Sequence, residues 1–241
     1  MTFDALKNRL GQFKITLWLG LVLCFINAGF LLGDALAPWF QSLCAWIQFD
    51  RTAILRGEIW RLFTGHLVHW SAAHFYLDTS VFIAQGIVFE QKLGRRYTQA
   101  LTVAAVAISL GLLLFQRDLV AYRGISGLIN TQLVLGAGLY VLDPSLKKSL
   151  KVIYCAVFGV HLFKIAYETA LKVPFFATDT LGDMGGFTPL AHLIGLLVGL
   201  VYLVAQIGIC FSSARHKKSG PTDTRKALAN RCACGPINRR A

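Results

Sequence analysis

Six long apolar runs constrain this chain more than any other feature of its sequence. They cover residues 15–33, 73–89, 97–115, 124–142, 152–171 and 187–211. Each is about long enough to cross roughly 30 Å of hydrocarbon at about 1.5 Å per helical residue. Composition agrees, because 55% of the 241 residues are hydrophobic and only 15% are charged. The sequence therefore predicts an all-α integral membrane protein with six transmembrane helices.

The basic residues predict how these helices are oriented. Of the 24 Lys and Arg residues, three precede the first run, three follow the second, three follow the fourth and eight follow the sixth. These seventeen share the side that holds both termini, so the positive-inside rule places both termini in the cytoplasm. The net charge of +12 then reflects topology and attraction to the lipid bilayer, and no nucleic-acid partner is expected.

The same runs divide the chain into three parts. Residues 1–14 form a cytoplasmic N-terminal segment, residues 15–211 form the membrane domain, and residues 212–241 form a basic cytoplasmic tail whose composition predicts disorder. The first outer loop, residues 34–72, contains the aromatic and uncharged stretch WFQSLCAWIQF. This composition is suited to lying in the membrane interface.

Polar residues within the runs gather at one depth. The second, fourth and sixth helices cross in the same direction, so their N-terminal ends lie on one side of the membrane. His74 and Asp78 begin the second run. Ser126 lies at the start of the fourth run, and His192 lies near the start of the sixth. We expect these four side chains to converge, and a serine beside a histidine supplies a nucleophile and its general base.

Glycines accompany both candidate catalytic residues. Gly124 and Gly127 lie close to the serine and leave its hydroxyl accessible to a carbonyl carbon, while N–H groups at a helix N-terminus could hold an oxyanion. Gly195 and Gly199 share a helix face with the histidine, at spacings of three and seven residues. Small residues at such spacing predict close packing of the sixth helix against a neighbour.

Other polar residues in the runs have structural interpretations. Lys164 and Glu168 are four residues apart on the fifth helix and can pair with each other. His161 is interpreted as a core histidine. Asn27 is interpreted as a residue that links helices through a hydrogen bond.

Three stretches, taken in order, resemble the rhomboid family of intramembrane serine proteases: GEIWRLFTGHLVHWSAAHFYLD, RGISG and AHLIGLLVGLVY. The resemblance covers about residues 45–205 and is strongest to the rhombosortases, which are similar in their compact six-helix core and a GHLVH stretch before the second helix. It implies a Ser126–His192 dyad with no acidic third member. It also implies that His74 and the serine backbone N–H hold the oxyanion, and that no cofactor or metal is needed.

The resemblance further implies the substrates and the location. Rhombosortase-like substrates are membrane-anchored, exported proteins with a C-terminal Gly-Gly motif, a transmembrane helix and a basic end. Glycines suit a cleavage site because they weaken the helix and expose a carbonyl group. The expected location is the bacterial inner membrane. Trp60 and Arg61 resemble the pair that fixes the first loop in the membrane surface, although an interfacial Trp beside a surface ion pair would look the same.

Two residues depart from the rhomboid pattern. Asp78 stands where the family usually has Asn, and Asn130 stands where many members have an aromatic residue that stacks on the catalytic histidine. Asp78 could stay protonated and donate a hydrogen bond as Asn would, which preserves the family's donor with the least rearrangement. Alternatively, an ionised Asp78 could accept a hydrogen bond from His74 and orient that ring.

Two other functions compete with proteolysis. His66, His69 and His74 could bind zinc or iron in a membrane metalloenzyme, although the chain has no HExxH motif. A transporter or a non-catalytic binding protein is the other alternative, and its function would not depend on Ser126. The absence of an evident internal repeat weakens the transporter hypothesis.

Overall fold

The computed structural model describes residues 11, 13–32, 37–173, 175 and 188–215, and their regular structure is almost entirely helical. In chain order the elements are α2 (Lys14–Ile26), α3 (Gly29–Leu32), α4 (Ala37–Ile47), β1 (Phe49–Asp50), α5 (Arg51–Leu55), α6 (Arg61–Thr64), η1 (Gly65–Leu67), α7 (Ala72–Leu93), α8 (Arg95–Phe115), β2 (Ala121–Tyr122), α9 (Ser126–Leu142), α10 (Lys148–Leu171) and α12 (Pro189–Arg215).

Each of the six apolar runs contains a helix. Within the described part of the chain, α7, α8, α10 and α12 are long and apolar enough to cross a membrane, whereas α2 and α9 are apolar but shorter. The prediction of a helical membrane protein is therefore supported at four spans, and six full spans remain a prediction. α12 continues to Arg215, four residues past its predicted end. Most of the two predicted terminal segments lies outside the described residues.

The first apolar run is interrupted at Asn27. α2 ends one residue earlier, and the Asn27 side-chain amide donates hydrogen bonds to the carbonyl oxygens of Leu23 and Leu67, both at 2.8 Å. Its side-chain oxygen accepts a hydrogen bond from the backbone N–H of His69 at 3.1 Å. Asn27 thus makes the linking hydrogen bond predicted for it, and it joins α2 to η1 and to His69 in the segment before α7.

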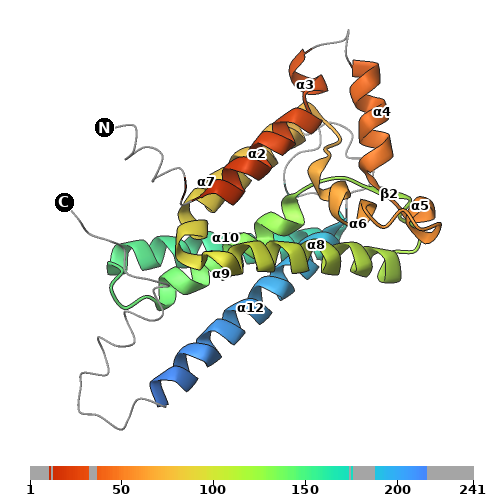
Figure 1. Cartoon of the computed structure of the whole chain (residues 1–241). Helices are drawn as coiled ribbons and strands as arrows, with labels where there is room; N and C mark the ends of the chain where they lie inside the picture. Colours follow the sequence, from red (N-terminus) through yellow and green to blue (C-terminus); the bar gives the residue numbers. More distant parts are fainter. Residues whose placement is uncertain (1–10, 12, 33–36, 174, 176–187, 216–241) are drawn as a thin grey trace, which may run out of the picture.

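α9 lies at the centre of the bundle (Figure 1). It packs against α7, α8, α10 and α12, and residues 127–137 are all buried. A helix enclosed by protein has no solvent-facing stripe, which accounts for a mostly apolar sequence whose polar residues, such as Asn130 and Thr131, are themselves buried. Because its neighbours cover it, α9 can also be short, at 17 residues.

The first loop is attached by its backbone to the segment that leads into α9. β1 and β2 pair antiparallel, with Phe49 opposite Tyr122. Near this pair, the backbone N–H of Gly124 donates to the carbonyl oxygen of Gly65 at 3.3 Å. The residues just before Ser126 are therefore held by the loop that precedes α7.

Arg61 holds this loop together from inside. Its guanidinium donates to the carbonyl oxygens of Ala45 at 3.0 Å and Gln48 at 2.9 Å, and it pairs with Glu58 at 2.7 Å. Arg61 is itself buried, so it is not part of a surface ion pair. The neighbouring Trp60 is exposed, as expected of an aromatic residue at a membrane interface.

Candidate active site

Ser126 is the first residue of α9, and the turn that precedes it requires glycine. Gly124 has φ +137, a conformation that side-chain-bearing residues rarely adopt. A Cβ atom on Gly124 would also lie 3.2 Å from Cε1 of His74, so there is little room for one. The Tyr122 hydroxyl fixes the turn by donating to the Gly124 carbonyl oxygen at 2.9 Å. The serine therefore stands at a helix N-terminus beside the first turn of α7.

His192 meets Ser126 from the first turn of α12. Its Nε2 lies 2.8 Å from the Ser126 Oγ, within hydrogen-bonding distance. Pro189 begins α12, a position that suits proline because the first N–H groups of a helix have no partner within it. The two residues predicted as nucleophile and base are thus in direct contact.

Glycines bring α9 and α12 close enough for this contact. A Cβ atom on Gly195 would lie 2.0 Å from the carbonyl oxygen of Gly127, and one on Gly199 would lie 3.0 Å from that of Thr131. The Thr131 hydroxyl also donates across the interface to the Gly195 carbonyl oxygen at 2.8 Å. Any side chain at position 195 would therefore force the helices apart.

The other ring nitrogen of His192 has a partner that the sequence analysis missed. Its Nδ1 lies 2.8 Å from Oε2 of Glu168 on α10. The predicted pairing of Glu168 with Lys164 is present at 2.8 Å, but it was an incomplete account of this carboxylate. The resemblance implied a dyad without an acidic third member, and the structure places a carboxylate against the histidine of that predicted dyad. α10 runs opposite to α9 and α12, so its C-terminal end lies at the depth of their N-terminal ends. The alternating direction of successive apolar runs could have predicted this depth for Glu168 from the sequence.

Asn130 takes part in the site through the backbone of α12. Its amide donates to the carbonyl oxygen of His192 at 3.1 Å, and its side-chain oxygen is hydrogen-bonded to Nε2 of His161. His192, the predicted base, is thus positioned here by hydrogen bonds rather than by an aromatic ring on α9. His161 is more than a core histidine, since it supports Asn130 and contributes to the cavity wall.

Asp78 contacts His74, one helical turn away on α7. Its Oδ2 lies 3.2 Å from the His74 Nε2 and 3.8 Å from the His69 Nε2. Ser71 caps α7 by accepting from the His74 backbone N–H at 3.2 Å. This carboxyl thus faces two imidazole rings, and the protonated and the ring-orienting forms of Asp78 both remain predictions.

A cavity of about 470 Å³ lies beside the serine, between α7, α9 and α10. Its polar lining includes Ser126, Asp78, Asn130, His161 and Lys164. The apolar part of its wall consists of Leu77, Val81, Ile129, Leu133, Ala156, Val157, Val160 and Phe175. The space is therefore mostly apolar with the serine hydroxyl on one side, which suits an apolar segment of polypeptide.

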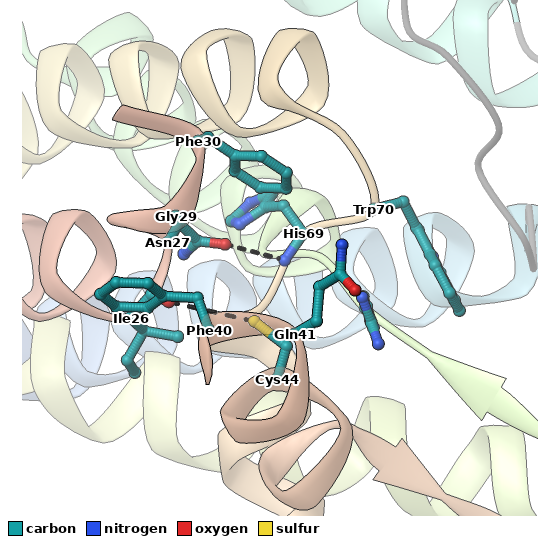
Figure 2. Close-up of a pocket in the computed structure, with 10 residues that line it drawn as sticks. Ile26, Asn27, Gly29, Phe30, Phe40, Gln41, Cys44, His69 and Trp70 are labelled. Carbon is teal, nitrogen blue, oxygen red and sulfur yellow. Dashed lines mark hydrogen bonds between the residues drawn. The ribbon is translucent and has the colours of Figure 1, made fainter. Parts of the chain in front are cut away.

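A second cavity, of about 310 Å³, lies between the C-terminal end of α2, the start of α3, the middle of α4 and the segment before α7 (Figure 2). Figure 2 shows His69 between Asn27 and Phe30 in its wall. Burial lowers the pKa of His69 to about 3, so the ring is neutral at physiological pH. Arg123, three residues before the serine, stacks over the ring of Trp70 at 4.4 Å.

The histidines proposed as metal ligands have other contacts. His66 Nε2 lies 3.0 Å from the carbonyl oxygen of Ala105 and 3.1 Å from the hydroxyl of Ser109. His69 and His74 stack edge to face, with ring centres 5.1 Å apart. Among the residues that the structure describes, no three His, Cys, Asp or Glu side chains are placed to hold a metal ion together.

Comparison with known families gives a match over most of this bundle. The family model of the Rhomboid domain matches residues 56–208, which is more than half of the chain. The matched part contains Ser126, His192, Glu168 and the α7 residues that face them. A search of curated proteins finds no match.

Proposed function

Because this chain belongs to the rhomboid family, we propose that it is an intramembrane serine endopeptidase in which Ser126 is the nucleophile and His192 the general base. Family membership itself implies an integral membrane protein with protease activity. The observation that carries the residue assignment is the 2.8 Å contact between the Ser126 Oγ and the His192 Nε2, beside a largely apolar cavity. This is the geometry that a base-activated serine requires.

The proposed reaction has two halves. His192 Nε2 takes the hydroxyl proton while the Ser126 Oγ attacks the peptide carbonyl carbon, and the imidazolium then gives that proton to the leaving amine. This leaves an ester on the serine. In the second half His192 takes a proton from water, the hydroxide attacks the ester, and the proton returns to the serine oxygen as the new carboxyl product leaves.

Charge that develops on the carbonyl oxygen needs hydrogen-bond donors. The first N–H groups of an α-helix have no carbonyl partner within it, and the N–H groups of Ser126 and Gly127 begin α9 beside the serine hydroxyl. The His74 ring lies against Gly124, at the entrance to the same turn. We assign oxyanion stabilisation to the Ser126 backbone N–H and the His74 ring, with Asp78 orienting that ring.

The proposed substrates are membrane-anchored proteins that end in a Gly-Gly motif, a transmembrane helix and a basic segment. This assignment is supported by the resemblance to rhombosortases, and a glycine pair would present an unobstructed carbonyl to a serine at a helix N-terminus. The proposed location is the bacterial inner membrane with both termini in the cytoplasm, a topology supported by the distribution of Lys and Arg.

Co-expression with candidate Gly-Gly-tailed proteins tests this function. Wild-type protein should release the substrate from its membrane helix, whereas Ser126→Ala and His192→Ala should each abolish release. The double variant should be no worse than either, because members of one catalytic unit are not additive. Ser42→Ala, at an exposed serine of α4, is the matched control and should cleave normally. Substantial cleavage by inserted Ser126→Ala would disprove the assignment and favour a transporter or binding protein.

A further inference from the structure

We infer that Glu168 is a positioning residue for catalysis, acting on Ser126 through His192, an inference that rests on the proposed serine protease function. The His192 ring has two nitrogens, and each lies 2.8 Å from one side-chain oxygen. A neutral imidazole carries one N–H donor and one acceptor. A Glu168 carboxylate only accepts, so Nδ1 must carry the proton. Nε2 is then left with the lone pair that activates the serine.

The carboxylate also matches the charge that appears during the reaction. His192 becomes an imidazolium when it takes the serine proton, and a carboxylate at 2.8 Å stabilises that cation. Glu168 is 2% exposed, so little water competes for this contact. The interaction is therefore stronger in the transition state than before the reaction, which is what accelerates a chemical step.

Lys164 explains how a carboxylate is tolerated at this depth. Its ammonium lies 2.8 Å from one oxygen of Glu168 and 2.9 Å from the other. The backbone N–H of Phe175 donates to the same carboxylate at 3.2 Å. A buried carboxylate with a neutralising cation and several donors can remain ionised among apolar helices. Lys164 thus keeps Glu168 charged, and Glu168 in turn orients His192.

A carboxylate with a purely structural role would not need to contact His192. The chain contains such a carboxylate in an ion pair elsewhere. Lys92 and Asp143 form an ion pair at 2.6 Å that has no histidine partner among the described contacts. Glu90 offers a second comparison, because it is buried to a similar degree and, among the described contacts, accepts from the backbone N–H groups of Ile15 and Thr16, at 3.0 and 2.8 Å. Neither pattern brings a carboxylate to a ring nitrogen of a proposed base.

The test measures the reactivity of the serine itself. Purified full-length protein in detergent is treated with a fluorophosphonate probe, and the second-order rate of Ser126 labelling is followed by mass spectrometry. Glu168→Gln should label at least about a hundredfold more slowly than wild type, since the corresponding loss in soluble serine proteases is on the order of ten-thousandfold. Glu168→Asp keeps the charge at a longer distance and should recover part of the rate. Glu90→Gln is the matched control and should label at the wild-type rate.

The pH dependence separates positioning from simple folding support. Loss of the carboxylate withdraws the stabilisation of protonated His192, so the acid limb of the labelling profile should move to lower pH in Glu168→Gln. Lys164, Asp78 and His161 also lie near this ring and are unchanged in that variant. A variant that is merely less stable would lose amplitude without moving the limb.

The outcomes are distinct. If wild-type Ser126 is not labelled, the proposed function fails and this inference fails with it. If wild type is labelled and Glu168→Gln is labelled equally fast with an unmoved profile, the inference alone is overturned. If Glu168→Gln does not fold, the wild-type protein decides the question, because ¹⁵N spectra of labelled histidine report the tautomer, with His192→Ala identifying the signal. A proton on Nε2 rather than Nδ1 in the resting enzyme would refute the assignment.

Discussion

The separation of α9 and α12 should control the reactivity of the serine. Three glycines of α12, Gly195, Gly199 and Gly208, allow this to be tested by substitution with alanine. In Gly195→Ala the new methyl group would begin 2.0 Å from the Gly127 carbonyl oxygen, and ordinary contact requires about 3.4 Å. The obstacle is backbone, so the helices must move apart by about 1.4 Å at this level. His192 lies one turn away on the same face.

This displacement is large compared with the geometry of the site. The hydrogen bond between the serine and His192 is 2.8 Å long, and an added 1 Å takes the two atoms beyond hydrogen-bonding reach. A misplacement of about 1 Å costs on the order of a hundredfold in rate. We therefore expect Gly195→Ala to reduce the rate of fluorophosphonate labelling by about that factor, with His192 unaltered.

Two further glycines in α12 provide the graded comparison. A methyl group on Gly199 would meet the Cβ of Val134 at 2.9 Å and the Thr131 carbonyl oxygen at 3.0 Å, so a shift of about 0.5 Å suffices. Gly199→Ala should lose only severalfold. Gly208 has nothing within 4 Å of its added methyl group, and Gly208→Ala should label at the wild-type rate.

The series is measured on protein that has been shown to be inserted and folded, by thermal unfolding in detergent. Alanine favours helix by about 1 kcal/mol over glycine, so a loss of activity without a loss of helix content is expected. Equal labelling rates for Gly195→Ala and Gly208→Ala would refute the reasoning, because contact between the helices would then not set the distance between serine and histidine.

Two other predictions follow from the outer part of the site. Asp78→Asn should lose about tenfold in labelling rate, because a neutral amide orients His74 less strongly than a carboxylate, and Asp78→Ala should lose more. An Asp78→Asn variant that is as active as wild type at every pH would instead support the protonated form of Asp78. Burial lowers the pKa of His66 from 6.5 to about 4 and that of His69 to about 3, so the unfolded chain binds protons between these values and pH 6.5 while the folded chain does not. The free energy of unfolding should therefore fall as the pH is lowered from 7.5 to 5, by roughly 2 kcal/mol for each histidine. In His66→Gln the unfolding midpoint should depend less on pH. An equally steep dependence in that variant would contradict this account.

The part of the site that follows from helix direction could be predicted from the sequence. His74, Ser126 and His192 lie at the N-terminal ends of helices that run the same way, so membrane thickness alone places them at one depth. Glycine at position 195 predicted a close helix contact for the same reason that it permits one, since it has no side chain. Both inferences use only local pattern and the geometry of a bilayer.

Residues with two partners could not be predicted in full. Lys164 lies four residues before Glu168 and gives it a sufficient local explanation, so nothing in the sequence called for a third group. Its contact with His192 depends on the rotation of α10 about its own axis, which is set by packing against α9 and α12. The end of α2 just before Asn27 could not be predicted either. The apolar run continues past this residue, so the sequence does not show that the helix stops where the Asn27 side-chain amide bonds to backbone groups.

The site is divided between two halves of the chain. Ser126, with His74 and Asp78, precedes the connection between α9 and α10, whereas Glu168 and His192 follow it. A chain cut at this connection would give one fragment that carries the proposed nucleophile and one that carries its proposed base. The glycine-lined contact of α9 with α12 would be the surface through which the fragments recognise each other. Fused to two membrane proteins, such fragments would form a proximity reporter that becomes reactive only when its halves meet within the bilayer.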